Sequence, residues 1–211
     1  MDRIKVLYFL EDRAQEGFIR KFVQRIAVEE SIPLDCLNHD IQSSRGGSSK
    51  VINEFKKFLK DTRRVGSSDI DFVVVAIDGN CKGHRDRVDQ LEKHIKGDHP
   101  FKGRVVYAVP DPHIERWYLM DQRALKEGVG LDRAPSMPPY KCERAYYKQV
   151  LNQALRESNV SSLLSGAEYA ERIIDKITDV ESLYDQNAGF RVFVEDLRRM
   201  LRNTLQRELG E

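Results

Sequence analysis

The fold of this chain is decided by residues 72–80, which read FVVVAIDGN. An uninterrupted apolar run rich in β-branched residues is typical of a strand that is buried on both faces. The Asp-Gly-Asn that follows is typical of a turn. A strand covered on both faces belongs in the centre of a parallel sheet, so this stretch favours an α/β protein.

The segments on either side of this strand repeat the same alternation. Strands are predicted at residues 4–10, 34–37, 72–77 and 104–109. Helices with one apolar face are predicted between them, at residues 14–27, 51–59 and 88–95. The second strand follows Pro33 and is expected to end at His39 and Asp40. Strands that alternate with helices predict a Rossmann-like α/β fold, with a mostly parallel sheet flanked by helices.

The pattern changes in the second half of the chain. Residues 128–139 contain Gly and Pro and are predicted to form a long surface loop. Apolar residues then recur at helical spacing, which predicts a helical C-terminal extension. At 211 residues we expect one domain, with an α/β core at 1–125 and a helical extension at 126–211 packed on it.

Charge and apolar content limit the possible partners and locations. A formal net charge of +1 gives no global field to attract nucleic acid, so such contact requires a local patch. The apolar runs are far shorter than the roughly 20 residues of a membrane span, and the N-terminus does not resemble a secretory signal. We therefore expect a cytoplasmic protein with no membrane partner. Cys36, Cys81 and Cys142 are predicted to be free thiols because their number and spacing suit neither a disulfide framework nor a zinc site.

Acidic side chains follow the predicted strands. Glu11 and Asp12 follow the first strand, Asp40 ends the second, Asp78 follows the third and Asp111 follows the fourth, with Glu115 one turn later. The carboxyl ends of parallel strands meet at one edge of a sheet, where ligands bind. Clustered carboxylates repel one another unless a cation lies between them, and hard oxygen ligands suit Mg²⁺ or Mn²⁺. A divalent-metal phosphodiester site is predicted, although any one of these acids is more often a helix cap.

These residues resemble the Toprim fold of topoisomerases, primases and OLD-type nucleases. The resemblance rests on Glu11 after the first strand and on the acidic turn that begins at Asp78. Residues 109–119 (VPDPHIERWYL) and 187–197 (NAGFRVFVEDL) are similar to a Toprim-like family of bacterial proteins related to RloB-like proteins of defence islands. The resemblance covers nearly the whole chain and implies a bacterial nuclease-like protein with a role in phage defence.

The resemblance also implies roles for individual residues. Glu11, Asp78 and Glu115 would be the catalytic residues. The metal ligands would be drawn from Glu11, Asp12, Asp78, Asn80, Asp111 and Glu115. Two positions depart from the Toprim pattern, because Asp12 replaces the usual Gly and Asn80 replaces the second Asp of the turn. Asn80 brings no charge, which weakens metal binding, and Asp12 could restore that charge.

Basic residues near the predicted edge could contact nucleic-acid phosphates. They are Arg45, Lys82, His84, Arg85 and Arg87. The alternative is a solvated helix face. Arg45 lies in a Gly-Ser loop that lacks the spacing of a nucleotide-binding P-loop. Trp117, the only tryptophan, is expected in the core and not in base stacking.

Three functions remain open at this point. The first is a metal-dependent nuclease acting on DNA or RNA. The second is a noncatalytic Toprim-like binding or regulatory subunit that works with an ATPase or another defence protein, which Asn80 favours. The third is an unrelated phosphohydrolase or nucleotide-binding protein in which Asp78 is the one key acid. The mixed charge of the last helix is typical of a solvated face and leaves a surface for a homo-oligomer or another partner open.

Overall fold

The computed structural model describes residues 3–43, 46–65 and 69–209. Its centre is a four-stranded sheet in the order β2-β1-β3-β4, and every neighbouring pair of strands is parallel. The strands are β1 (Ile4–Leu10), β2 (Leu37–Ser43), β3 (Phe72–Ala76) and β4 (Val105–Ala108). The predicted Rossmann-like α/β fold is confirmed.

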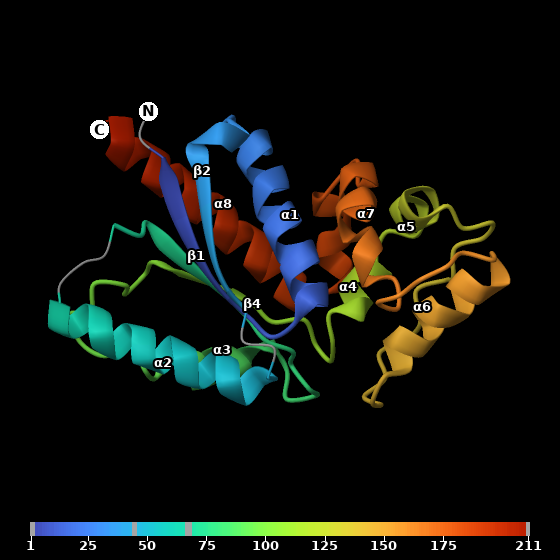
Figure 1. Ribbon diagram of the computed structural model, residues 1–211, viewed down its shortest axis with the longest axis horizontal. Helices are drawn as coiled ribbons and strands as arrows, with labels where there is room; N and C mark the ends of the chain where they lie inside the picture. The colour runs from blue at the N-terminus through green and yellow to red at the C-terminus, as the bar shows by residue number, and fades with distance from the viewer. Residues whose placement is uncertain (1–2, 44–45, 66–68, 210–211) are drawn as a thin grey trace.

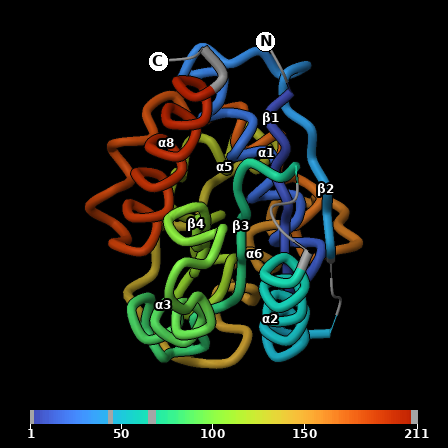
Figure 2. The backbone as a smooth tube through the Cα atoms, turned by 90° about the vertical axis from the view of Figure 1, so that its left-hand side faces the viewer, coloured from blue at the N-terminus to red at the C-terminus, as the bar shows by residue number. Residues whose placement is uncertain are grey.

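Helices cover both faces of the sheet. They are α1 (Arg13–Glu29), α2 (Ser48–Val65), α3 (His84–Glu92), α4 (Glu115–Tyr118), α5 (Gln122–Val129), α6 (Tyr146–Glu157), α7 (Ala170–Lys176) and α8 (Ala188–Leu209). Short 3-10 helices lie at Leu34–Cys36, Ala167–Tyr169 and Glu181–Gln186. Helices α1 and α8 lie on one face and α2 and α3 on the other, while α4 to α7 extend from one end (Figure 1). The start of β1 and the end of α8 lie at the same edge of the molecule (Figure 2).

The strand side chains alternate between two apolar clusters. Val6 and Tyr8 of β1 belong to the cluster under α1 and α8, whereas Leu7 and Phe9 belong to the cluster under α2. This alternation follows from the two-residue period of a strand. All five residues of β3 are fully buried, as expected of a strand covered on both faces.

Helix α8 comes last in the chain but forms part of the main core. Its Phe190 and Phe193 rings contact Trp117 at centroid distances of 5.2 and 5.6 Å. Trp117 is buried, which confirms that it packs in the core. On the surface, Arg198 pairs with Glu29 at 2.7 Å, and Arg202 Nη2 donates to Glu30 at 2.8 Å. Part of the mixed charge of this helix therefore joins α8 to α1.

The predicted second strand is wrong in position. Residues 34–36 form a 3-10 helix and the strand runs from Leu37 to Ser43, paired with β1 from Ile4↔Leu37 onward. His39 and Asp40 therefore lie inside the strand and not at its end. The misplacement arises because β2 is an edge strand with polar residues, whose apolar pattern is weak. His39 lies on the same face of the sheet as Tyr8, and a 2.8 Å hydrogen bond joins its Nδ1 to the Tyr8 hydroxyl.

The start of the predicted surface loop is also wrong. Gly128 and Val129 belong to α5, and the extended segment begins after Gly130. A Cβ atom on Gly128 would lie 2.7 Å from the Cα of Ile173 in α7. Glycine is therefore needed here for two helices to approach closely, and it does not mark a turn. In the described part of the chain, no helix has the length and apolar character of a membrane span.

Candidate active site

The turn after β3 is fixed by the segment after β4. The Gly79 amide donates to the Pro110 carbonyl at 2.7 Å, and the Asn80 amide donates to the Pro112 carbonyl at 2.9 Å. A Cβ atom on Gly79 would lie 2.2 Å from Oδ1 of Asp111, so only glycine fits at this position. Asn80 and Cys81 have φ of +48° and +65°, in the left-handed region that most residues avoid. The contacts on both sides hold this turn in place.

The turn brings Asp78 to Glu11. Strands β1 and β3 are neighbours and end at the same level, because Leu10 pairs with Ala76. The backbone amide of Asp78 donates to Oε2 of Glu11 at 3.0 Å. Burial raises the pKa of the Glu11 carboxyl, and the charge of Asp78 raises it further, against hydrogen bonds from the backbone of Asp78 and Ser48.

The side chain of Asp78 is 15% exposed, and its carboxylate holds several elements together. Its Oδ1 accepts hydrogen bonds from Gln15 Nε2 at 3.0 Å and from the Ile114 amide at 3.2 Å. Its Oδ2 accepts from Nδ1 of His113 at 3.1 Å. Burial raises the pKa of Asp78, and the bonds from His113 and Gln15 oppose that rise.

His113 and Glu115 complete the cluster from the segment after β4. The hydrogen bond to Asp78 raises the pKa of the His113 imidazole, and the negative charges of Asp78, Glu115 and Glu11 act in the same direction. Burial raises the pKa of Glu115, which the charge of Asp78 raises further. The structure thus brings Glu11, Asp78 and Glu115 into one electrostatically coupled group, with His113 hydrogen-bonded to Asp78.

Gln15 contributes to this site but was not predicted, and Arg87, which was expected to contact phosphate, instead points inward. Gln15 is fully buried, and its Oε1 accepts from the Glu11 amide at 3.1 Å while its Nε2 reaches Asp78. Arg87 is 5% exposed, and its Nε and Nη2 donate to the Asp78 carbonyl at 3.1 and 3.0 Å. Both residue types are common on solvated helix faces, so a single sequence carries no signal that these two point inward.

The remaining predicted metal ligands have other partners. Asp12 is the N-cap of α1, and its Oδ1 accepts from the Gln15 amide at 2.9 Å. Asn80 turns its amide back to the Asp78 carbonyl at 3.3 Å. Asp111 accepts from the Cys81 amide at 3.0 Å and from the Tyr140 hydroxyl at 2.8 Å. Each of these side chains supports the turn or helix beside it.

The residues predicted to contact phosphate differ in their surroundings. Lys82 and Arg85 are exposed at the start of α3 and stay available for such a role. His84 packs against α8, since its Cδ2 would lie 3.1 Å from a Cβ on Gly189. Arg45 lies outside the described residues.

The prediction that all three cysteines are free is wrong. Cys81 and Cys142 form a disulfide with their Cα atoms 5.7 Å apart, and Cys36 is the free thiol. The Cα separation is typical of a disulfide. The two half-cystines are 61 positions apart in the sequence, and only the fold brings the turn after β3 to the segment before α6.

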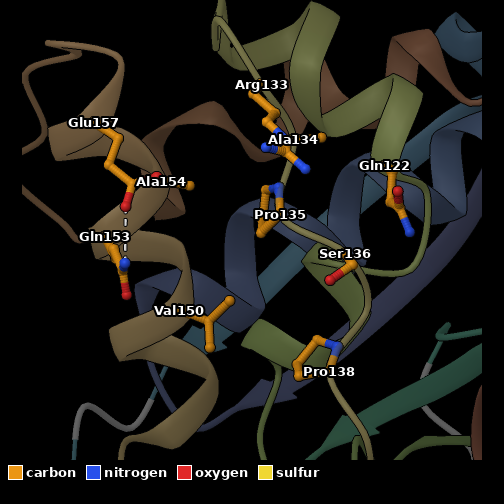
Figure 3. Close-up of a pocket in the computed structure, with 10 residues that line it drawn as sticks. All are labelled: Gln122, Arg133, Ala134, Pro135, Ser136, Pro138, Val150, Gln153, Ala154 and Glu157. Carbon is orange, nitrogen blue, oxygen red and sulfur yellow. Dashed lines mark hydrogen bonds between the residues drawn. The ribbon is translucent and has the colours of Figure 1, made fainter.

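The acidic group opens to the surface beside Glu11. A hollow of about 410 Å³ is lined by Glu11, Asp12, Arg13 and Gly47. A larger cavity of about 500 Å³ lies between α6 and residues 133–138 (Figure 3). None of the clustered acids lines that larger cavity, whereas Glu11 lines the smaller hollow.

The acids do not fit a metal ion in this arrangement. They offer the hard oxygen donors that Mg²⁺ prefers, but both oxygens of Asp78 already accept hydrogen bonds. Among residues 3–43, 46–65 and 69–209, no three His, Cys, Asp or Glu side chains are spaced to hold a metal. Binding of the expected Mg²⁺ or Mn²⁺ stays a prediction, and it requires the hydrogen bonds of Asp78 to rearrange.

Comparison with known proteins adds no relative. The chain matches no family model, and searches of curated proteins and of solved structures give no significant match. The functional argument therefore rests on the geometry of the site.

Proposed function

We propose that the protein is a nuclease-like hydrolase of the Toprim type that cleaves phosphodiester bonds of nucleic acids at Glu11, Asp78 and Glu115. One observation carries the proposal: at the carboxyl edge of a parallel sheet, the Asp78 amide donates to the Glu11 carboxylate, and the Asp78 carboxylate accepts from the amide of Ile114, the residue before Glu115. This edge is where α/β proteins place their ligands. The resemblance to Toprim proteins supports the same assignment.

The chain's own groups suit acid–base chemistry on a phosphodiester. A carboxyl whose pKa is raised can hold a proton closer to neutral pH, and can deliver it to a leaving oxygen. Glu115 would take this role, and Glu11, beside the hollow, would face the substrate. His113 carries positive charge more readily because Asp78 is bonded to it, and it would offset the charge of the phosphate.

A second candidate is a noncatalytic Toprim-like binding or regulatory subunit. Two observations favour it. Both carboxylate oxygens of Asp78 already accept hydrogen bonds, and the side-chain amide of Asn80 donates to the Asp78 carbonyl in its own turn. Such a subunit would work with an ATPase or another defence protein. A cytoplasmic location and a role in phage defence belong to both candidates as proposals.

The test is cleavage of plasmid, linear and single-stranded DNA and of RNA, each with Mg²⁺, with Mn²⁺ and with a chelator. Wild type is compared with Glu115→Gln and with Glu127→Gln, a matched control whose carboxylate pairs with Arg123 on the surface of α5. We expect wild type and Glu127→Gln to cut equally and Glu115→Gln to lose at least a hundredfold, the size expected for loss of a proton-transfer group.

The outcomes separate the candidates. Cleavage by wild type that Glu115→Gln retains in full would place the chemistry elsewhere. No cleavage of any substrate, with retained binding of a labelled oligonucleotide, would favour the binding subunit. Cleavage only with a divalent cation would show that the hydrogen bonds of Asp78 rearrange when metal binds.

A further inference from the structure

The disulfide joins the candidate site to an extended segment, residues 131–145, which we call the tethered segment. At one end Cys81 follows the turn that carries Asp78, and its amide donates to Oδ1 of Asp111 at 3.0 Å. At the other end Cys142 lies just before α6. The bond therefore fixes a long irregular stretch to the edge of the sheet where the acids gather.

The tethered segment has few other attachments. Asp132 donates from its amide to Oγ of Ser158 at 3.0 Å, and residues 133–138 make no hydrogen bond to any part of the described chain. The next attachments lie within three residues of Cys142. The Pro139 carbonyl accepts from the Tyr147 hydroxyl at 3.3 Å, the Tyr140 hydroxyl donates to Asp111, and the Lys141 amide donates to the Tyr147 hydroxyl at 2.9 Å. Residues 133–138 form one wall of the larger cavity, opposite α6 (Figure 3).

The contacts of this segment converge on the residues that carry the site. Asp111 receives the Cys81 amide on one oxygen and the Tyr140 hydroxyl on the other. The Arg116 guanidinium lies 5.1 Å from the centre of the Tyr140 ring and donates to the Asp111 carbonyl at 3.0 Å. His113 and Glu115 lie between these two anchored residues. These contacts form a route by which loosening of the tethered segment would reach them.

Both half-cystines are accessible to solvent. Cys81 and Cys142 are exposed, whereas buried disulfides are shielded from attacking thiolates. An exposed bond opens and closes by thiol–disulfide exchange. A dithiol reductant supplies two electrons and two protons, the Cys81–Cys142 bond breaks to two thiols, and the reductant becomes a disulfide.

We propose that Cys81 and Cys142 form a reversible redox latch that holds the tethered segment against residues 111–116. Oxidation orders the rim of the acidic site and reduction releases it. The structural part of this proposal is independent of the proposed function. The part that concerns cleavage rests on that function.

The experiment is hydrogen exchange, read by mass spectrometry, on the oxidised protein and on protein reduced with dithiothreitol. We expect reduction to add the mass of two hydrogens and to speed exchange about tenfold at the hydrogen-bonded amides of Lys141 and Cys81, with a smaller increase at residues 111–116. Cys81→Ser and Cys142→Ser should resemble the reduced protein under both conditions. Cys36→Ser, which removes the free thiol, should respond as wild type does.

Two results would overturn the latch. One is that no Cys81–Cys142 bond forms when the protein is treated with oxidised glutathione. The other is equal exchange in the oxidised and reduced protein. Cleavage is measured in parallel, and equal rates in both states would overturn control of the site even if exchange changes. If wild type cuts nothing in either state, the proposed function fails while exchange still decides the latch.

Discussion

The acids directly after the two central strands meet, whereas Asp40 and Asp111, the acids predicted at the ends of the two outer strands, do not join them. Glu11 and Asp78 follow β1 and β3, and the Asp78 amide donates to the Glu11 carboxylate. Asp40 lies inside β2 and is exposed. Asp111 follows β4, but its carboxylate holds Cys81 and Tyr140. The same residue type at four predicted strand ends thus has different roles.

The difference shows what limits the rule that ligands bind at the carboxyl ends of parallel strands. All four strands end at the same level, because Leu10 pairs with Ser43 and Ala76, and Ala76 pairs with Ala108. The rule therefore brings acids together only when they follow a strand end closely: Asp40 lies three residues before the end of β2, and Asp111 lies three residues after the end of β4. Burial at this edge also decides the electrostatics. The acids that lose solvent have a raised pKa, and these include Glu115 after the outer strand β4 as well as Glu11 and Asp78.

The largest expected effect is that of Asp78→Ala. The substitution leaves the buried donors of Gln15, His113 and Ile114 without their acceptor, at a cost of about 3 kcal/mol of unfolding free energy. Asp40→Ala removes an exposed carboxylate and should change this free energy by less than about 0.5 kcal/mol. Urea denaturation measures both. Similar losses for the two variants would remove the distinction between central and outer acids.

A smaller effect is expected of Gly79→Ala. The new Cβ would meet Asp111 at 2.2 Å and push apart the segments that follow β3 and β4. We expect a loss of about 2 kcal/mol, in the range for overpacking a tight site. Gly17→Ala in α1 is the matched control, because its Cβ would lie at an ordinary 3.4 Å from Ala170 and alanine favours a helix. A thermal midpoint for Gly79→Ala equal to that of wild type would show that the turn is looser than described.

The pKa values of His113 and His39 should be shifted in opposite directions. Asp78 raises the pKa of His113 above its ordinary value, whereas burial lowers the pKa of His39 in the outer strand. The stability from His113 is therefore present below pH 6.5 and is lost as the pH rises through the folded pKa. For His39, stability is lost as the pH falls through its ordinary value toward the folded pKa. NMR titration of the imidazole signals checks the order, and a lower pKa for His113 than for His39 would contradict it.

The sequence was sufficient for the central part of the fold. The apolar runs of β1, β3 and β4 predict those strands to within a residue, because buried parallel strands have no polar side to mask the pattern. The edge strand β2 was misplaced, since its exposed polar residues carry no such pattern. Gly128 was misread for a different reason, because a glycine required by helix packing looks the same in sequence as one required by a turn.

Only those site residues that directly follow a predicted strand could be predicted from the sequence. Glu11 and Asp78 follow their strands directly, so their proximity could be expected, and the function assigned to them stays a prediction. The inward direction of Gln15 and Arg87 depends on packing between distant elements, as does the pairing of Cys81 with Cys142. Such contacts leave no local periodicity to detect.

The most direct test of the central claim is the cleavage rate of Glu11→Gln beside that of Asp40→Asn. Glu11→Gln keeps an oxygen that can accept from the Asp78 amide but removes the charge, and the raised pKa of Glu11 means that its ionised form costs stability at neutral pH. We predict that Glu11→Gln loses at least a hundredfold in rate with an unfolding midpoint no lower than that of wild type, while Asp40→Asn keeps the wild-type rate. A folded Glu11→Gln protein that cuts as fast as wild type would contradict the account.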